Sequence, residues 1–298
     1  MRDFLKNCTY SLFRRAQRIG VNIMPNHFYV PIADVNALAA DRDHWARPSL
    51  MTGIAIDADA QVRKLRSTVL PYQSEYADNA AYREGIAGRF GPGYGPIEAQ
   101  ALHGYLRHLK PKTVIEVGAG VSTHCMLSAM KDHPAKHICI EPYPSDFLRS
   151  IGVELHEQRV ETMDPSFFDR LEAGDFLFID SSHAVRAGGD VLFLYLEVLP
   201  RLKPGVHVHI HDVYLPYNYN RTILLTYMQW SETALLQALL VNNSRLSIAF
   251  SLSLLHYSKP DALREVFPGY TPQADRNGLV DSMSGDGHFP SSIYLVTG

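Results

Sequence analysis

Cysteine, tryptophan and long apolar runs are scarce in this chain, and each scarcity argues against a class of protein. The 298 residues include only 3 cysteines and 2 tryptophans. Cys8, Cys125 and Cys139 are scattered, and the last two lie within apolar segments. We interpret them as small hydrophobic residues in a reducing compartment, not as a disulfide framework. The cysteine pattern therefore predicts a cytoplasmic protein.

No apolar run reaches the roughly 20 residues that a membrane-spanning helix needs. The first residues show neither a long apolar core nor a small-residue cleavage site, so the start is not typical of a secretory leader. Charge of one sign is also lacking, because 28 lysines and arginines stand against 31 aspartates and glutamates, a net charge of −3. Without a basic excess, we expect no nucleic-acid partner.

Strand-like and helix-like segments alternate from residue 112 onward. The predicted strands are 113–118, 137–141, 152–156, 175–180, 205–211, 246–257 and 291–297. The predicted helices are 122–132, 144–151, 165–173, 187–202 and 221–241. This alternation, closed by an antiparallel pair, predicts an α/β fold with a doubly wound, Rossmann-like, seven-stranded sheet in the strand order 3-2-1-4-5-7-6.

The first 88 residues lack this alternation. We predict that residues 1–88 form an N-terminal extension, helical and proline-containing, and that residues 89–298 form the main domain. Residues 1–24 combine apolar side chains with Arg14, Arg15 and Arg18. Such a basic amphipathic helix either packs on its own domain or on a partner subunit in a homodimer, or makes peripheral contact with a membrane.

The glycine-rich segment 114–123 carries the clearest functional signal. It indicates a buried strand, the turn Gly118-Ala119-Gly120 and a helix, and Glu141 ends the next strand. In open α/β sheets this pattern holds a ribose-bearing cofactor, with the carboxylate on the ribose hydroxyls. A dinucleotide site needs a small residue where Thr123 stands, whereas S-adenosylmethionine (SAM) has no phosphate to seat there. The predicted SAM contacts are Glu116, Gly118, Gly120, Ser122, Thr123 and Glu141, with Tyr94 as a lid.

Acidic and histidine residues follow the fourth and fifth strands. Asp180 ends one strand and is followed by His183, and the other strand ends with His211 and Asp212. Strand alternation places His211 and Asp212 on opposite faces. Two chemistries remain open. Either Asp180, Asp212 and His211 hold Mg²⁺ or Mn²⁺, which lowers the pKa of an acceptor hydroxyl, or His183 or His211 acts as general base, oriented by Asp180.

These motifs resemble class I SAM-dependent methyltransferases of the bacterial methyltransferase-24 type. The resemblance rests on residues 114–123, 138–144, 178–183 and 198–212, and covers roughly residues 90–220. It implies a Rossmann-like fold and SAM as methyl donor. Catechol-type O-methyltransferases are more distant relatives, and they place a metal on an Asp after the fourth strand and an Asp-Asn pair after the fifth. Asp180 and Asp212 match, but Val213 stands where that Asn would be.

The sequence therefore predicts a methyltransferase acting on an oxygen of a small molecule or glycan. Two alternatives remain open at this point. One is a nicotinamide-dependent oxidoreductase, which Thr123 disfavours, and the other is a non-catalytic binding protein that uses the same fold.

Overall fold

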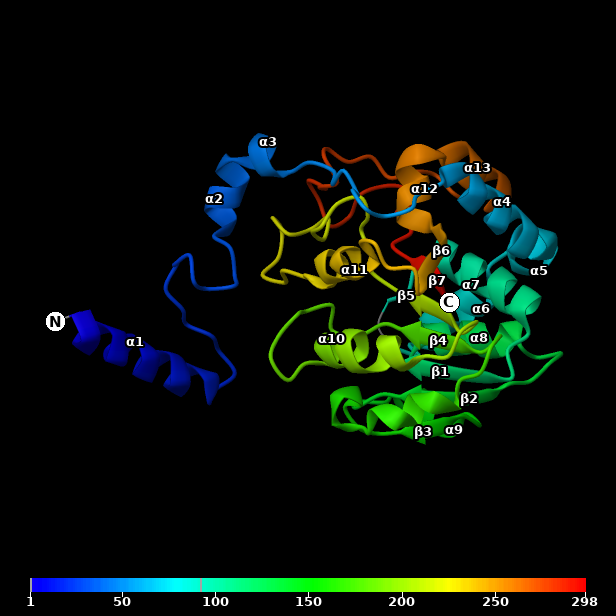
Figure 1. The fold of residues 1–298 in the computed structure, drawn as a ribbon, viewed down its shortest axis with the longest axis horizontal. Coiled ribbons are helices and arrows are strands. Elements are labelled where there is room, and N and C mark those ends of the chain that lie inside the picture. Colours follow the sequence, from blue (N-terminus) through cyan, green and yellow to red (C-terminus); the bar gives the residue numbers. More distant parts are fainter. Residues whose placement is uncertain (1, 92) are drawn as a thin grey trace.

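Seven strands form a single mixed sheet in the computed structural model, which describes residues 2–91 and 93–298 (Figure 1). The strands are β1 (Thr113–Val117), β2 (Lys136–Ile140), β3 (Glu154–His156), β4 (Phe176–Ile179), β5 (His207–Ile210), β6 (Leu246–Ser251) and β7 (Ile293–Thr297). Their order is β3-β2-β1-β4-β5-β7-β6, and only β7 pairs antiparallel with its neighbours. The predicted Rossmann-like architecture and strand order are confirmed.

Thirteen α-helices are described, and most of them cover the two faces of this sheet. They are α1 (Arg2–Gln17), α2 (Val35–Ala40), α3 (Arg42–Trp45), α4 (Ala58–Thr68), α5 (Gln73–Tyr76), α6 (Ala80–Ala87), α7 (Pro96–Leu109), α8 (Val121–Ala129), α9 (Asp146–Ser150), α10 (Asp190–Phe193), α11 (Glu232–Leu240), α12 (Leu252–Ser258) and α13 (Pro260–Val266). Shorter helical turns are η1 (Leu70–Tyr72), η2 (Val160–Thr162), η3 (Pro165–Arg170), η4 (Leu194–Val198) and η5 (Leu199–Arg201).

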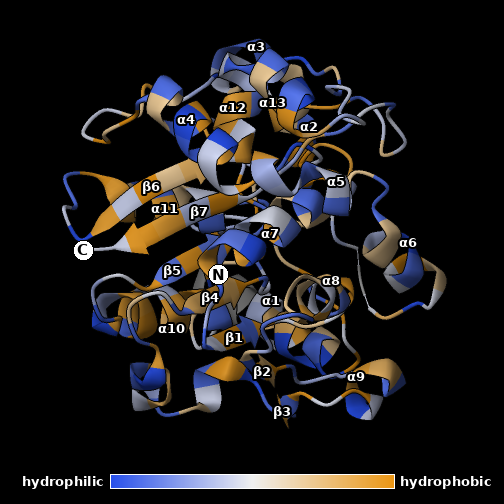
Figure 2. Ribbon diagram, turned by 90° about the vertical axis from the view of Figure 1, so that its right-hand side faces the viewer, coloured by the Kyte–Doolittle hydropathy of each residue, from blue (hydrophilic) through white to orange (hydrophobic). Residues whose placement is uncertain are grey.

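Side-chain alternation along the strands divides the core into two layers. On one face Ile115 and Leu177 pack against residues of α10, η4 and α11. On the other face Val114 and Phe178 pack against α4, α7, α8, α12 and α13. In Figure 2 the strands β6 and β7 are largely orange, the colour of hydrophobic residues. Burial on both faces explains why β2 and β4 are almost continuously apolar after their first residues.

The strand order reverses between β1 and β4, because the chain winds outward to β2 and β3 and then returns. In open α/β sheets, ligands bind in the crevice outside the carboxyl ends of the strands at this point. The loops that follow β1, β2, β4 and β5 meet there, so the topology determines where a functional site must be sought.

Two predicted elements are wrong in part. The predicted strand 246–257 ends at Ser251, whose side chain accepts a hydrogen bond from Leu254 N and begins α12. Short apolar runs do not distinguish strand from helix, which explains the error. The predicted helix 221–241 is helical only from Glu232 to Leu240. Its start is set by a distant contact, since the backbone N–H groups of Ser231 and Glu232 donate to the carbonyl of His183.

The first 88 residues divide into two parts. From α2 onward they pack on the main domain, with Trp45 against Tyr219, α4 against β6 and α6 against α8. Before that, α1 stands apart from the sheet in Figure 1. Of the segment 1–24 predicted as amphipathic, Met1 lies outside the described residues. In the described part of the chain, no helix combines the length and apolar character that crossing a bilayer requires.

One buried histidine beneath β6 makes the stability of the fold sensitive to pH. Burial, helped by the nearby Arg221, lowers the pKa of His256 to about 4, and its Nδ1 pairs with the Tyr270 hydroxyl at 2.7 Å. An unfolded chain takes up that proton near pH ~6.5. The stability that neutral His256 contributes is therefore fully present above pH ~6.5 and is lost as the pH falls toward about 4.

We expect His256→Gln to flatten the pH dependence of the unfolding free energy in this window, by at most about 1.4 kcal/mol per pH unit. Urea unfolding at a series of pH values measures this slope. The exposed His44→Gln variant is the control. Parallel curves for wild type and His256→Gln would contradict the prediction.

Candidate functional site

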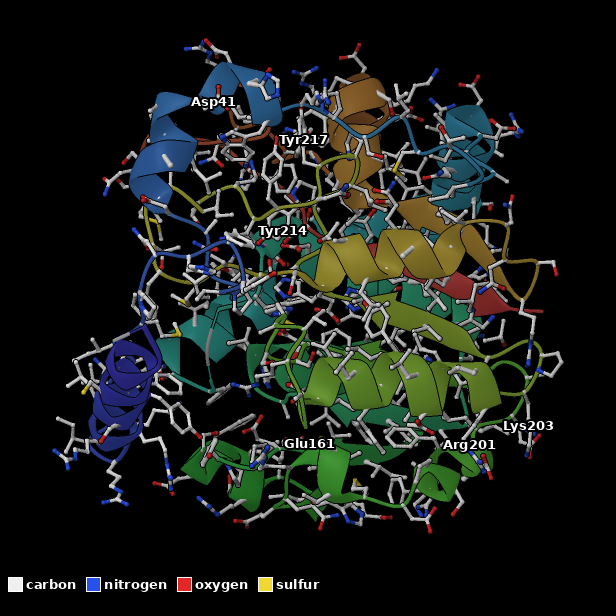
Figure 3. All side chains as sticks on the ribbon, turned by 60° about the vertical axis from the view of Figure 1, so that its left-hand side comes forward. Asp41, Glu161, Arg201, Lys203, Tyr214 and Tyr217 are labelled. Atoms are coloured by element: carbon white, nitrogen blue, oxygen red, sulfur yellow. The ribbon has the colours of Figure 1, made fainter. Side chains whose placement is uncertain are left out.

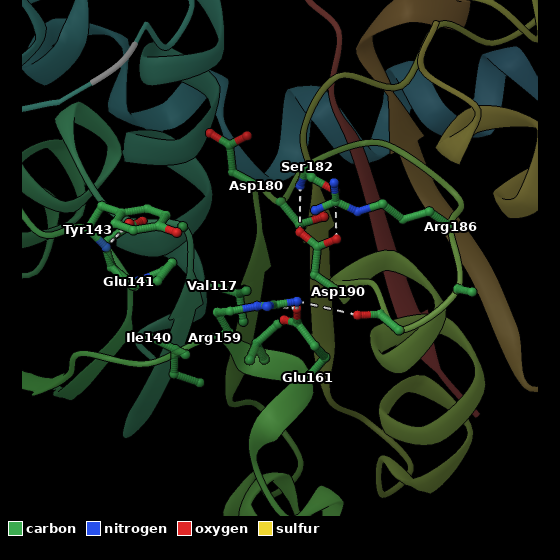
Figure 4. Close-up of a pocket in the computed structure, with 16 residues that line it drawn as sticks. Val117, Ile140, Glu141, Tyr143, Arg159, Glu161, Asp180, Ser182, Arg186 and Asp190 are labelled. Carbon is green, nitrogen blue, oxygen red and sulfur yellow. Dashed lines mark hydrogen bonds and ion pairs between the residues drawn. The ribbon is translucent and has the colours of Figure 1, made fainter. Parts of the chain in front are cut away.

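Two adjoining pockets open at the carboxyl ends of the parallel strands. The first, which we call the β2 pocket, has a volume of about 580 Å³ and is lined by residues that include Tyr143, Glu161 and Asp190 (Figure 4). The second, the β5 pocket, has a volume of about 280 Å³ and is lined by residues that include Tyr94, His183, His211, Asp212 and Trp230. Gly118, Glu141 and Asp180 line both pockets, so the two form one continuous site.

The glycine turn is clamped between two neighbouring strand ends. Gly118 N donates to the carbonyl of Ile140, and Asp180 N donates to the carbonyl of Val117. Gly118 has φ +80°, and a Cβ at this position would lie 1.9 Å from the carbonyl oxygen of Asp180. Glycine is therefore required here by the backbone of the loop after β4. Glu141 lies beside the turn and accepts a hydrogen bond from Ala119 N at 3.3 Å.

Most of the predicted SAM contacts surround the pockets. Those that line the β5 pocket are Tyr94, Gly118, Gly120, Ser122 and Glu141. Tyr94 is buried, and its hydroxyl lies 3.3 Å from His209 Nε2, so the ring covers the inner wall of the pocket.

Glu116 and Thr123 lie behind the turn instead. The buried Glu116 carboxylate accepts hydrogen bonds from Ser122 Oγ at 2.7 Å and His137 Nε2 at 2.9 Å. Thr123 Oγ1 accepts from Gly120 N at 3.0 Å. Neither residue lines either pocket. Their placement supports a role in holding the turn rather than direct contact with a cofactor.

Four side-chain atoms from the loops after β4 and β5 converge in the β5 pocket. Oxygen and nitrogen alternate around this donor cluster. Asp180 Oδ1 lies 3.2 Å from His211 Nδ1 and 3.4 Å from His183 Nε2. Asp212 Oδ2 lies 3.5 Å from His183 Nε2 and 3.7 Å from His211 Nδ1. The cluster unites all four residues that were predicted for catalysis or metal binding.

Each histidine of the donor cluster has a buried glutamate on its other nitrogen. His183 Nδ1 donates to Glu232 Oε2 at 2.8 Å, and His211 Nε2 lies 3.1 Å from Glu98 Oε1. Sequence reasoning missed both glutamates. Each stands in the first turn of a helix, where acidic residues are common for purely local reasons. The two glutamates fix the imidazole orientations, so that His183 Nε2 and His211 Nδ1 face the cluster.

The convergence of Asp212 with His211 corrects an expectation based on strand alternation. Alternation ends at Ile210, the last residue of β5, and Asp212 has φ +53°. This left-handed backbone turns the Asp212 side chain back toward the pocket. His183 also has a positive φ, +58°. Such conformations are costly outside glycine and are concentrated at functional sites.

Electrostatics within the cluster favour charged side chains. Burial alone would lower the pKa of His183, but hydrogen bonds to Asp180 and Glu232 outweigh it and raise the pKa to about 10. Burial also opposes the charged form of His211, yet Asp212, Asp180 and Glu98 raise its pKa well above the usual value. The pKa of Asp180 is lowered, because the two histidines outweigh burial.

The tyrosine-rich loop after β5 faces inward. Tyr214 and Tyr217, which are labelled in Figure 3, are buried. The Tyr214 hydroxyl donates to Asp212 Oδ1 at 3.0 Å, so this tyrosine supports the cluster. Trp230 lines the β5 pocket together with Tyr94, and its ring centroid lies 4.7 Å from that of His183. Sequence reasoning missed Trp230 because it fell in a segment predicted to be helical.

Comparison with protein families identifies one domain in the chain. A family model described as a methyltransferase domain, of the methyltransferase-24 type, matches residues 115–213. The matched segment runs from β1 to the residue after Asp212, and it therefore includes the glycine turn, Glu141 and the donor cluster.

One relative and two solved structures share low sequence identity with this chain. An uncharacterised protein of Archaeoglobus fulgidus is 26% identical over 174 residues, which are 52% of this chain and 76% of the relative. The structure of an O-methyltransferase from Bacillus cereus with S-adenosylhomocysteine (SAH) is 13% identical, covers 80% of this chain and 100% of its own, and has a TM-score of 0.44. A Podospora anserina methyltransferase with bound SAH is 17% identical, with coverages of 76% and 93% and a TM-score of 0.38.

Proposed function

Because the chain carries a class I SAM-dependent methyltransferase domain, we propose that it methylates an oxygen of a small molecule or glycan with the help of a divalent cation. The domain assignment supports the predicted enzyme class and disfavours the nicotinamide alternative. The observation that carries the proposal is the donor cluster, in which two carboxylate oxygens and two imidazole nitrogens alternate at 3.2–3.7 Å.

We expect SAM to lie across the continuous site in one orientation. The carboxylate of Glu141, shared by both pockets, is positioned to accept hydrogen bonds from the ribose hydroxyls. The adenine would then occupy the β2 pocket, and the sulfonium would face the β5 pocket. Gly118 supports this position of SAM. A side chain at Gly118 would enter the space between the turn and the loop after β4.

The two carboxylates of the donor cluster suit Mn²⁺ or Mg²⁺, whereas its two imidazoles suit a transition-metal ion. Donor atoms at right angles around an octahedral ion lie roughly 3 Å apart for bonds of ~2.1 Å, close to the spacings observed here. Metal-bound histidines usually donate their other N–H to a carboxylate, as Glu232 and Glu98 allow. Two imidazoles among four donors match Mn²⁺ better than Mg²⁺. Asp180, His183, His211 and Asp212 would hold the ion.

A cation at this position would lower the pKa of an acceptor hydroxyl and stabilise the alkoxide or phenolate. Residues of the chain would position the methyl donor and the acceptor. The glycine turn and Glu141 orient the donor, and Trp230 and Tyr94 exclude water from the β5 pocket and enclose the acceptor. Methyl transfer then depends mainly on alignment of acceptor oxygen, methyl carbon and sulfur.

A second candidate mechanism uses His183 as a general base without a metal. The hydrogen bond between His183 Nδ1 and Glu232 favours it, because this bond leaves Nε2 directed at the pocket. A pKa of about 10 works against it, since His183 is then already protonated at neutral pH and cannot accept the acceptor's proton.

The metal-assisted proposal is tested by titrating the metal-free protein with Mn²⁺ and following the free ion by electron paramagnetic resonance. We expect one Mn²⁺ site per chain, and SAH binding by calorimetry. With labelled SAM and a panel of phenols and sugars, chelation by EDTA should stop methyl transfer and Mn²⁺ should restore it. Absence of any Mn²⁺ site would reject the metal-assisted mechanism. Absence of SAH binding would reject SAM as the methyl donor.

We expect Glu232→Gln to weaken Mn²⁺ binding by about 10- to 100-fold, because a neutral amide orients the His183 imidazole less firmly and lowers its basicity. The same titration measures this change. The exposed Glu197→Gln variant carries an identical chemical change on the surface and should bind Mn²⁺ like wild type. An unchanged affinity in Glu232→Gln would mean that Glu232 does not support the site.

A further inference from the structure

Residues 8–33, which we call the N-terminal arm, extend away from the sheet domain (Figures 1 and 3). From Gln17 to Ala33 every residue is exposed except the half-buried Val30. Large apolar side chains are among them, with exposed fractions of 79% for Ile19, 82% for Phe28 and 84% for Tyr29. Such a continuous set of exposed apolar residues calls for a partner.

The arm has charge of only one sign. Arg14, Arg15 and Arg18 are exposed, and residues 8–33 contain no aspartate or glutamate. None of the three arginines forms an ion pair with a described residue, whereas most other arginines of the chain do. The partner should therefore be anionic.

Helix α1 separates these two properties onto opposite sides. Helical spacing places Leu12, Phe13 and Ala16 on one side of α1 and Arg14 and Arg15 on the other, and Arg18 follows directly after the helix. A helix with an arginine-rich polar face and an apolar face of aliphatic and aromatic residues is typical of one that lies in a membrane interface. Exposed aromatic residues further along the arm suit the same interface.

The arm ends beside the candidate active site. Ala33 N donates to Gln229 Oε1 at 2.7 Å, and Gln229 Nε2 donates back to the carbonyl of Ala33 at 3.0 Å. Gln229 precedes Trp230, which lines the β5 pocket. The neighbouring Tyr227 is 86% exposed. A surface that binds the arm therefore lies near the mouth of this pocket.

We propose that the N-terminal arm docks the protein on the surface of an anionic lipid bilayer. A second copy of the chain would have to offer a rigid, complementary surface to an arm that is irregular from residue 18 to residue 34. A fluid bilayer needs no such match, and its anionic headgroups pair with the arginines while its interface accepts Ile19, Phe28 and Tyr29. This docking does not depend on the proposed methyl acceptor or metal.

Co-sedimentation of the full chain with vesicles tests the proposal. We expect binding to phosphatidylcholine vesicles that contain phosphatidylglycerol, little binding to pure phosphatidylcholine, and loss of binding at high salt. The triple variant Arg14→Glu/Arg15→Glu/Arg18→Glu should weaken binding by at least about 100-fold, given about 1 kcal/mol for each basic residue. Phe28→Ser/Tyr29→Ser should weaken binding without removing its salt dependence.

The control variant Arg63→Glu/Arg83→Glu/Arg89→Glu changes the net charge equally, through exposed arginines outside the arm, and should still bind. Unchanged SAH binding and thermal unfolding would show that each variant folds. Equal binding of the two triple variants would overturn the proposal, as would absence of binding to anionic vesicles. A dimer in light scattering that dissociates only in the arm variant would assign the arm to a second copy and also overturn it.

Discussion

Replacing Asp180 by asparagine is expected to abolish Mn²⁺ binding at micromolar concentrations and to slow methyl transfer by about 1000-fold. Asp180 Oδ1 lies 3.2 Å from His211 Nδ1 and 3.4 Å from His183 Nε2, so the change replaces a charged carboxylate at the centre of the donor cluster with a neutral, weaker-binding amide. The rate effect corresponds to about 4 kcal/mol, within the several kcal/mol that a metal contributes to stabilising charge in a transition state.

The same change distinguishes the two mechanisms. If the protein uses His183 as a base without a metal, Asp180→Asn alters the rate, but neither wild type nor variant binds Mn²⁺. The exposed Asp146→Asn variant is the matched control and should keep both properties. A variant Asp180→Asn that binds Mn²⁺ as tightly as wild type would exclude Asp180 as a ligand.

Replacing Gly118 by alanine is expected to weaken SAH binding by at least about 100-fold, from about 3 kcal/mol of strain placed on the turn. The new Cβ would lie 1.9 Å from the Asp180 carbonyl, on a backbone with φ +80°. Both strand ends are hydrogen-bonded to their neighbours, so the turn has to move away from Glu141. Calorimetry with SAH measures the loss.

Gly152→Ala serves as the control, because a Cβ at Gly152 meets no atom within 4 Å. The thermal midpoint of Gly118→Ala should also fall, since the strain belongs to the fold as well as to the site. SAH binding equal to that of wild type would mean that the turn is not part of the cofactor site.

The sheet was predictable from the sequence because parallel strands buried on both faces are continuously apolar. The glycine turn and Glu141 were predictable for a related reason, since each follows a strand directly and its position depends on local sequence. Elements whose conformation depends on distant contacts could not be predicted from the local sequence. The start of α11 is set by the carbonyl of His183, and α12 begins at a serine cap inside an apolar run.

The donor cluster was predicted in part for the same reason. Asp180, His211 and Asp212 follow strands that end at the same edge, so their proximity follows from topology. Topology does not predict the left-handed backbone at Asp212, nor the glutamate that contacts the other nitrogen of each imidazole. Glu98 and Glu232 reach the cluster from helices that are far apart in the sequence, and no local pattern indicates that two such helices meet.

The hydrogen bonds on Asp212 also bear on the kind of acceptor. Its Oδ1 accepts from Tyr214 Oη and Ser291 Oγ, so only Oδ2 faces the cluster and the residue would act as a monodentate ligand. If Asp180, His183, His211 and Asp212 held a cation, it would remain accessible to oxygen atoms of the acceptor. Such a cation would favour acceptors that offer adjacent oxygens, such as vicinal diols, over simple alcohols.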